Sequence, residues 1–154
     1  MLAPQAGLGC GALMTGVGPH GIDACCAQAT LDSKGYFARL CLDQHTSVLH
    51  GAALALRTAD FIAVGGISTG LSHPLLMGAD ISLKLVQRGQ TLIWTPYAQV
   101  DCPPGMLAPG SSLAAQAPEL ALFEQLWRRK LCLDPFYNPN LDTQNACYRL
   151  PGDH

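Results

Sequence analysis

One carboxylate, Asp80, is the first candidate for chemistry in this sequence. It lies in the run MGADISLKLVQR, whose apolar residues have the spacing of an amphipathic helix. A carboxylate there could take a proton as a general base, or it could be a structural acid near the helix N-terminus, stabilised by about 0.3–1 kcal/mol. His73, in LSHPLL, could contact a substrate from the loop before the helix, or be an ordinary turn residue.

Two aromatic residues are candidates for binding a ligand. Trp94 and Tyr97 lie in the run TLIWTPYAQV, and such rings can stack on the apolar face of a sugar. Trp94 alternates with Ile93 on the expected strand, so a place in the core is the other interpretation.

Further along the chain, two groups of residues have structural interpretations. The basic cluster Arg128, Arg129 and Lys130 could form a solvated helix face or bind an anionic, lipid-linked acceptor. Phe136 and Tyr137 are expected to pin the C-terminal segment onto the domain rather than to bind a ligand.

Metal chemistry has little support in the cysteine pattern. The seven cysteines contain no CxxC pair; they are Cys10, Cys25, Cys26, Cys41, Cys102, Cys132 and Cys147. Zinc sites usually show short ligand spacings, so we expect mostly reduced, structural thiols and no bound metal. His20, beside a glycine turn, does not change this expectation.

Four elements must position these side chains. The pattern predicts a buried strand over residues 48–56 and a short helix over 57–64, with Thr58 as a possible N-cap and Gly65 at its end. A helix is expected over 77–88, with Gly89 as a left-handed C-cap. A strand follows over 91–100, in which Pro96 indicates either a sheet edge or a bulge.

The remaining chain divides into a turn-rich beginning, one more helix and loops. Residues 1–34 are rich in turns, and GALMTGVG could be one edge strand or a loop. Residues 103–118 read as a mobile loop, and 120–131 as a helix with Phe123 and Trp127 at helical spacing. Prolines at positions 135 and 139 prevent that helix from continuing.

Composition narrows the class of protein. The chain has 154 residues, 49% of them hydrophobic and 13% charged, with a formal net charge of −2. A chain of this length suits one domain that buries roughly 70% of its unfolded surface. No long basic run indicates nucleic-acid binding. The uncharged stretch 61–79 contains glycines and a proline, so a transmembrane helix is not expected, and we expect a cytoplasmic, soluble chain.

Three segments, in order, resemble one enzyme family. GAALALRTADFIAVGGI is similar to the acceptor-side strand and helix of family-2 glycosyltransferases of the GT-A type. ADISLKLVQRGQTLIWTPYAQV is similar to the segment after their catalytic carboxylate, and FEQLWRRKLCLDPFYNPNLD to the C-terminal signature of a bacterial polysaccharide and O-antigen subgroup. KGYFARL also fits that subgroup. The resemblance covers residues 35–141.

The resemblance implies a fold and an incomplete set of reacting groups. It implies an α/β fold, the C-terminal half of a GT-A-like nucleotide-diphospho-sugar transferase, with few strands and flanking helices. The DxD motif, whose carboxylates hold Mg²⁺ or Mn²⁺ in the donor-binding half, is absent from the sequence. The family's catalytic base is an Asp, commonly within an acidic-Asp-x-Asp run at the start of the helix; its position falls on Gly78 here, and Asp80 matches the last Asp of that run. Asp101 or Cys102 replaces the family's metal-ligating His and could coordinate a cation.

The resemblance also bears on acceptor binding. Gly51 lies in the acceptor-side segment. His50 replaces a residue that is often small and hydroxyl-bearing in the family, so its bulk is expected to narrow an acceptor pocket. The implied acceptor-binding set is Gly51, His73, Trp94 and Tyr97. The implied domain plan is a segment 1–34, a glycosyltransferase-like region 35–141 and a tail 142–154.

Two functions are therefore expected as alternatives. The first is transfer of a sugar from a nucleotide-sugar donor to a carbohydrate acceptor, with an inverting mechanism. The isolated chain would be inactive without a donor-binding half, which would also bring Mg²⁺ or Mn²⁺; this chain itself is expected to hold no cofactor. The second is a non-catalytic, glycosyltransferase-derived module that binds carbohydrate, another transferase or a second copy of itself. Peripheral membrane contact is compatible with either function.

Overall fold

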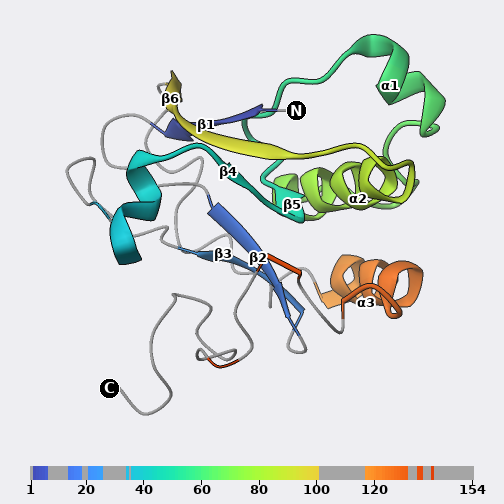
Figure 1. The fold of residues 1–154 in the computed structure, drawn as a ribbon. Coiled ribbons are helices and arrows are strands. Elements are labelled where there is room, and N and C mark those ends of the chain that lie inside the picture. The colour runs from blue at the N-terminus through green and yellow to red at the C-terminus, as the bar shows by residue number, and fades with distance from the viewer. Residues whose placement is uncertain are drawn as a thin grey trace.

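The described part of the protein is a mixed α/β structure (Figure 1). The computed structural model describes residues 2–6, 14–18, 21–25, 34, 36–100, 117–131, 135–136 and 140. The elements in these ranges are β1 (Leu2–Ala6), β2 (Met14–Gly18), β3 (Gly21–Cys25), the 3₁₀ helix η1 (Tyr36–Cys41), β4 (Gln44–His45), β5 (Val48–Leu49), α1 (Thr58–Ala63), α2 (Pro74–Gln87), β6 (Ile93–Val100) and α3 (Ala117–Trp127).

The first sheet places β6 in its centre, in the order β1-β6-β4. β1 runs parallel to β6 and β4 runs antiparallel to it. The alternative that Pro96 marks an edge strand is therefore wrong. The β1–β6 register shifts between Ala3 and Gln5, which pair with Trp94 and Gln99. Pro96 lies inside this irregular stretch, as the bulge alternative predicts, because proline cannot donate a ladder hydrogen bond.

The second sheet is antiparallel, with the order β3-β2-β5. β2 is its central strand, which corrects the prediction of a single edge strand or loop in GALMTGVG. The strand predicted over 48–56 is only two residues long, Val48 and Leu49, and both are buried. The chain turns directly afterwards because Gly51 meets the start of α2, as the next subsection describes.

α2 is the central helix of the described structure. It begins at Pro74, three residues before the predicted start, because proline is well suited to the first helical position. It ends as predicted, with Gly89 at a φ of 77°. The hydroxyl of Ser82, itself fully buried, accepts a hydrogen bond of 2.9 Å from the backbone N–H of Leu49 and so ties α2 to β5.

The two other helices flank this centre. α1 begins after Arg57, which occupies the N-cap position, so Thr58 lies inside the helix and the predicted cap is wrong. Gly65 follows α1 with a φ of 76°, as expected for a left-handed residue at a helix end. α3 lies beside α2 (Figure 1). It buries Phe123 and Trp127, the pair predicted from helical spacing.

Two hydrophobic clusters lie on different sides of α2. The cluster toward α3 consists of Val48, Leu71, Leu75, Leu76, Ala79, Leu83, Phe123, Trp127 and Leu131. The cluster toward β6 consists of Leu40, Leu49, Ile81, Leu85, Leu92 and Trp94. A helix with apolar residues on both sides is a buried helix, so α2 organises the core. Within the described ranges, no helix is long and apolar enough to cross a membrane.

Candidate functional site

The first turn of α2 lies directly against the chain that leaves β5. The backbone N–H of Gly51 donates a hydrogen bond of 3.0 Å to the carbonyl of Pro74. A Cβ atom on Gly51 would lie 2.3 Å from that carbonyl oxygen and 2.9 Å from the nitrogen of Gly78. Two backbones can approach this closely only where both contacting residues are glycines, which have no Cβ atom. Gly51 is thus a packing residue at the site where acceptor contact is predicted.

Gly78 is enclosed in the same contact. A Cβ atom on Gly78 would lie 2.2 Å from the nitrogen of Gly51, 2.3 Å from the carbonyl oxygen of Leu49 and 2.7 Å from the carbonyl carbon of His50. All three are backbone atoms, which cannot move aside as a flexible side chain can. The position that matches the family's base is therefore filled by neighbouring backbone and holds no space for a carboxylate.

His50 is buried beside this glycine contact, with 6% of its surface exposed. Its Nδ1 accepts a hydrogen bond of 3.0 Å from the N–H of Ala52, so the neutral ring carries its proton on Nε2. Burial, followed by the nearby charge of His73, lowers the pKa of His50 from 6.5 to about 4. The imidazole is therefore neutral at pH 7, and with Nδ1 occupied by Ala52 it offers only the N–H donor at Nε2.

This neutral histidine predicts an acid-sensitive fold. The folded-state pKa lies below the unfolded one, so the unfolded chain binds the proton more tightly and the free energy of unfolding falls as the pH drops from 6.5 to 4. The full loss is about 3 kcal/mol below this window. We expect His50→Asn, which keeps an acceptor near the Nδ1 position, to flatten this part of the curve. Urea denaturation of both proteins at several pH values measures it, and parallel curves would contradict the assignment.

His73 occupies the N-cap of α2, and its backbone N–H bonds the side chain of Glu119, which lies in α3. The Glu119 carboxylate accepts hydrogen bonds from the N–H and hydroxyl of Ser72, at 2.8 and 2.5 Å, and from the N–H of His73, at 2.9 Å. These bonds, with Ser72 contributing most, lower the pKa of Glu119 to about 2. A carboxylate at a helix N-terminus also meets the positive end of the dipole. Its stabilising effect is present above the ordinary pKa of 4.5 and is lost as the pH falls toward 2.

One atom of the His73 ring, Nδ1, is still able to form a hydrogen bond. This atom is buried and has no hydrogen-bond partner among the described residues. The charge of this ring is the second cause, after burial, of the lowered pKa of His50. Gly51, His73 and Gly78, three of the residues singled out from sequence, thus come together with His50 at the first turns of α2.

Asp80 faces away from that contact and is fully buried. Its carboxylate accepts hydrogen bonds from the N–H of Ser68 at 2.8 Å, the Ser68 hydroxyl at 2.9 Å and Nε1 of Trp127 at 3.0 Å. Nζ of Lys84 forms an ion pair with it at 2.8 Å and also donates to the carbonyl of Gly66 at 2.7 Å. Both carboxylate oxygens are therefore occupied by structural donors, which leaves the predicted role of a base without an exposed oxygen.

The structural alternative for Asp80 also needs correction. No acidic residue lies in the first turn of α2, and Asp80 is the seventh residue of the helix. It therefore does not act as an N-terminal acid. It stabilises the fold as a buried acceptor that joins α2, α3 and the loop after α1.

The two aromatic candidates are placed differently. Trp94 is 1% exposed and belongs to the cluster between α2 and β6, so its ring is a core residue and offers no face to a ligand. Tyr97 is 74% exposed, and its hydroxyl donates a hydrogen bond of 3.3 Å to the carbonyl of Cys41. Neither ring belongs to the contact around Gly78. Acceptor binding by Tyr97 stays a prediction.

The other sequence candidates have mostly structural surroundings. Arg128, Arg129 and Lys130 are exposed, as the solvated-face alternative predicts. The Phe136 ring meets the His45 ring edge-on, with centroids 6.0 Å apart, as expected for a residue that pins the chain. Tyr137, Asp101, Cys102 and residues 142–154 lie outside the described residues. Among the residues that are described, no group of three or more His, Cys, Asp or Glu side chains could hold a metal ion.

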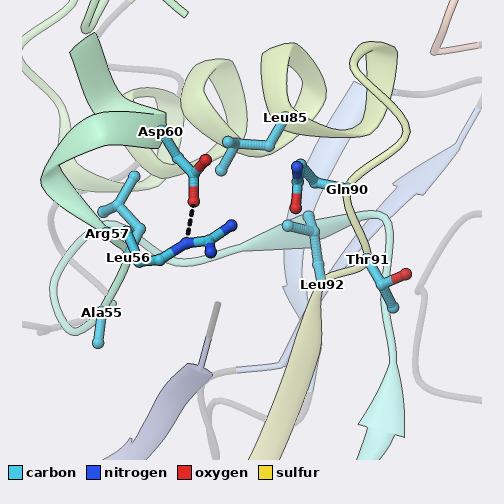
Figure 2. A pocket seen from close by; sticks show the side chains of 8 residues that line it. All are labelled: Ala55, Leu56, Arg57, Asp60, Leu85, Gln90, Thr91 and Leu92. Atoms are coloured by element: carbon cyan, nitrogen blue, oxygen red, sulfur yellow. Dashed lines mark hydrogen bonds and ion pairs between the residues drawn. The ribbon is translucent and has the colours of Figure 1, made fainter. Parts of the chain in front are cut away.

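A pocket of about 450 Å³ lies beside the C-terminal end of α2 (Figure 2). Its lining residues are Ala55, Leu56, Arg57, Asp60, Leu85, Gln90, Thr91 and Leu92. None of them was a site candidate in the sequence. Its polar members come from the start of α1 and from the segment that joins α2 to β6. These two stretches are far apart in the sequence, and no sequence pattern indicates that they meet.

Comparisons with known proteins leave the family of this chain open. No known protein-family profile matches it, and no solved structure does. It is similar to an uncharacterized protein named y4gI from Sinorhizobium fredii, with 31% identity over 123 residues. The match covers 77% of this chain and 14% of y4gI. The chain therefore corresponds to a small part of that relative, whose name states no activity.

Several important residues had no sequence signal. Glu119 bonds Ser72, 47 residues away, and Trp127 bonds Asp80 at the same separation. Ser68 follows a glycine pair and reads as a loop residue. Only Lys84 carried a local signal, since a Lys four residues after an Asp on a helix suggests an ion pair.

Proposed function

We propose that this chain is the acceptor-side half of a family-2 glycosyltransferase of the GT-A type. The supporting observation is that the three segments that carry the resemblance meet around the ion pair of Asp80 and Lys84. Lys84 and Asp80 lie in the second segment. Trp127, in the third, bonds Asp80, and the carbonyl of Gly66, in the first, accepts a hydrogen bond from Lys84. The Asp80–Lys84 pair thus joins the three segments into a single packed unit, which is the arrangement expected if they descend from a common scaffold.

In this proposal, the chain binds and orients a carbohydrate acceptor, and the donor comes from elsewhere. A donor-binding half, on another polypeptide or in another part of a longer chain, would hold the nucleotide sugar and its Mg²⁺ or Mn²⁺ through a DxD motif. The metal would neutralise the diphosphate of the donor as it leaves. The similarity to a small part of y4gI supports a segment of this kind working within a larger protein.

A second candidate is a non-catalytic module derived from such an enzyme. The observation that favours it is the enclosure of Gly78, where a Cβ atom would meet backbone at 2.2 Å. An inverting transfer needs a base that removes the acceptor proton, and this position cannot supply one. The module would then bind carbohydrate or a partner transferase without performing transfer.

Titration of the purified chain tests the proposal. We expect no binding of UDP-glucose, with or without Mn²⁺, by isothermal titration calorimetry. We expect an oligosaccharide from a bacterial O-antigen to shift the NMR amide signals of Gly51 and His73 at the start of α2. UDP-glucose binding would contradict the assignment to the acceptor half. Absence of any saccharide response at these two residues would contradict the acceptor role in both versions of the proposal.

A further inference from the structure

We infer that the pocket between α1, the C-terminal end of α2 and residues 90–92 binds a neutral polyhydroxylated ligand, specifically a single pyranose ring. Its volume of about 450 Å³ falls within the range of roughly 300–1,000 Å³ that is usual for small-molecule sites. The site lies beside the C-terminal end of α2, whereas His73 is at its N-cap, and the inference does not depend on the proposed function.

The floor of the pocket is apolar and rigid. Leu85, from α2, is 3% exposed, and Leu92, before β6, is 2% exposed. Both belong to the hydrophobic cluster toward β6, against which Leu56 also packs. Core side chains of this kind hold their positions, so the floor is formed before a ligand arrives. This apolar floor suits the C–H face of a sugar ring, which is also apolar. Binding would remove both apolar surfaces from water.

Polar groups converge above this floor. Arg57 Nε donates to Oδ2 of Asp60 at 2.7 Å. Figure 2 shows the guanidinium group extending from this bond into the pocket, with the Gln90 side chain facing it from the other side. Among the described residues, the terminal nitrogens of Arg57 and Oδ1 of Asp60 have no hydrogen-bond partner, so they remain able to bond a ligand.

The charge of these groups indicates a neutral ligand. The guanidinium and the carboxylate are paired at 2.7 Å, so the wall carries both signs and no net charge. An anion would gain from Arg57 and be repelled by Asp60. A hydroxyl group both donates and accepts, so neighbouring hydroxyls on one ring can accept from Arg57, donate to Asp60 and bond either end of the Gln90 amide. Vicinal diols match this alternation better than a phosphate or a carboxylate does.

NMR titration with four neutral methyl glycosides, those of glucose, galactose, mannose and rhamnose, tests the inference. Inorganic phosphate and glucuronate serve as anionic probes. We expect at least one neutral glycoside to shift the amide signals of Gln90 and Leu92 in a saturable way, while those of Gly51 and His73 stay in place. Saturable shifts at Gln90 with phosphate alone would overturn the inference in favour of an anion site. No saturable shift with any glycoside would also overturn it.

Three variants separate the pocket from the rest of the helix end. Gln90→Ala and Asp60→Ala each remove one hydrogen-bonding side chain, so we expect the dissociation constant of the glycoside to rise about fivefold in each. Gln87→Ala is the matched control, because Gln87 is also exposed near the end of α2 but does not line the pocket. Equal weakening in Gln87→Ala and Gln90→Ala would overturn the inference. Unchanged amide spectra outside the pocket establish that each variant is folded.

Discussion

Gly78→Asp is expected to unfold the protein or to destabilise it by about 3 kcal/mol or more. The reason is the contact between α2 and the chain after β5. A Cβ atom at this position would lie between 2.2 and 2.7 Å from three backbone atoms, which belong to Leu49, His50 and Gly51. Relief requires α2 to move away from β5. That movement would also break the Ser82–Leu49 hydrogen bond. Urea denaturation followed by circular dichroism measures the loss.

Gln87→Asp is the control for this substitution. Gln87 is exposed on the same helix, so an aspartate there tests the cost of the residue type without the backbone contact, and we expect a change within about 0.5 kcal/mol. The contrary outcome is informative. A Gly78→Asp protein as stable as the parent, and active in sugar transfer with a donor-binding half, would mean that Gly78 is only a lost base. The structure instead indicates that the neighbouring backbone has closed over that position.

The parts of the fold that sequence patterns predicted correctly depend on local physics. The end of α2 at Gly89 and the left-handed Gly65 follow from the freedom of glycine to adopt positive φ. The burial of Phe123 and Trp127 follows from helical spacing. The irregular pairing around Pro96 follows from its missing N–H. Each of these features is decided by a few neighbouring residues.

The parts that could not be predicted depend on contacts between distant segments. β2 became a central strand because β5 pairs with it, and the pattern in residues 14–18 contains no information about that partner. The N-cap of α2 is completed by Glu119 of another helix rather than by a local Ser or Asp. Gly78 looked like a vacated catalytic position because its close neighbours, residues 49–51, are far away in the sequence.

Contacts with distant segments also determine the role of Asp80. In the sequence it was the only carboxylate near the position of a catalytic base. In the structure it meets four donor groups from three parts of the chain: the N–H and hydroxyl of Ser68, Nε1 of Trp127 and Nζ of Lys84. The position of Asp80 is therefore explained by packing, without any catalytic role. A stability measurement distinguishes this role from a catalytic one.

Asp80→Asn is expected to lower the free energy of unfolding by about 3 kcal/mol, a large share of the roughly 5–15 kcal/mol typical of a domain. Asparagine keeps the shape, but its amide presents one acceptor oxygen and an NH₂ group that faces other donors. It also leaves Lys84, whose side chain is 20% exposed, without its ion-pair partner at 2.8 Å. Tryptophan fluorescence during urea denaturation follows the loss, because both Trp94 and Trp127 are buried in the folded protein.

Asp60→Asn provides the matched control, since it makes the same chemical change in an exposed pair. Asp60 and Arg57 are an i,i+3 pair whose Arg side chain is 76% exposed, and such pairs contribute at most about 1 kcal/mol. The difference between the two losses in the free energy of unfolding thus measures how much more the buried carboxylate stabilises the fold than the exposed one. Equal, small losses would show that Asp80 is dispensable for the fold, and its charge would then require a functional explanation. A large loss in Asp80→Asn alone, with Asp60→Asn near the parent, identifies Asp80 as the group that holds α2, α3 and the loop after α1 together.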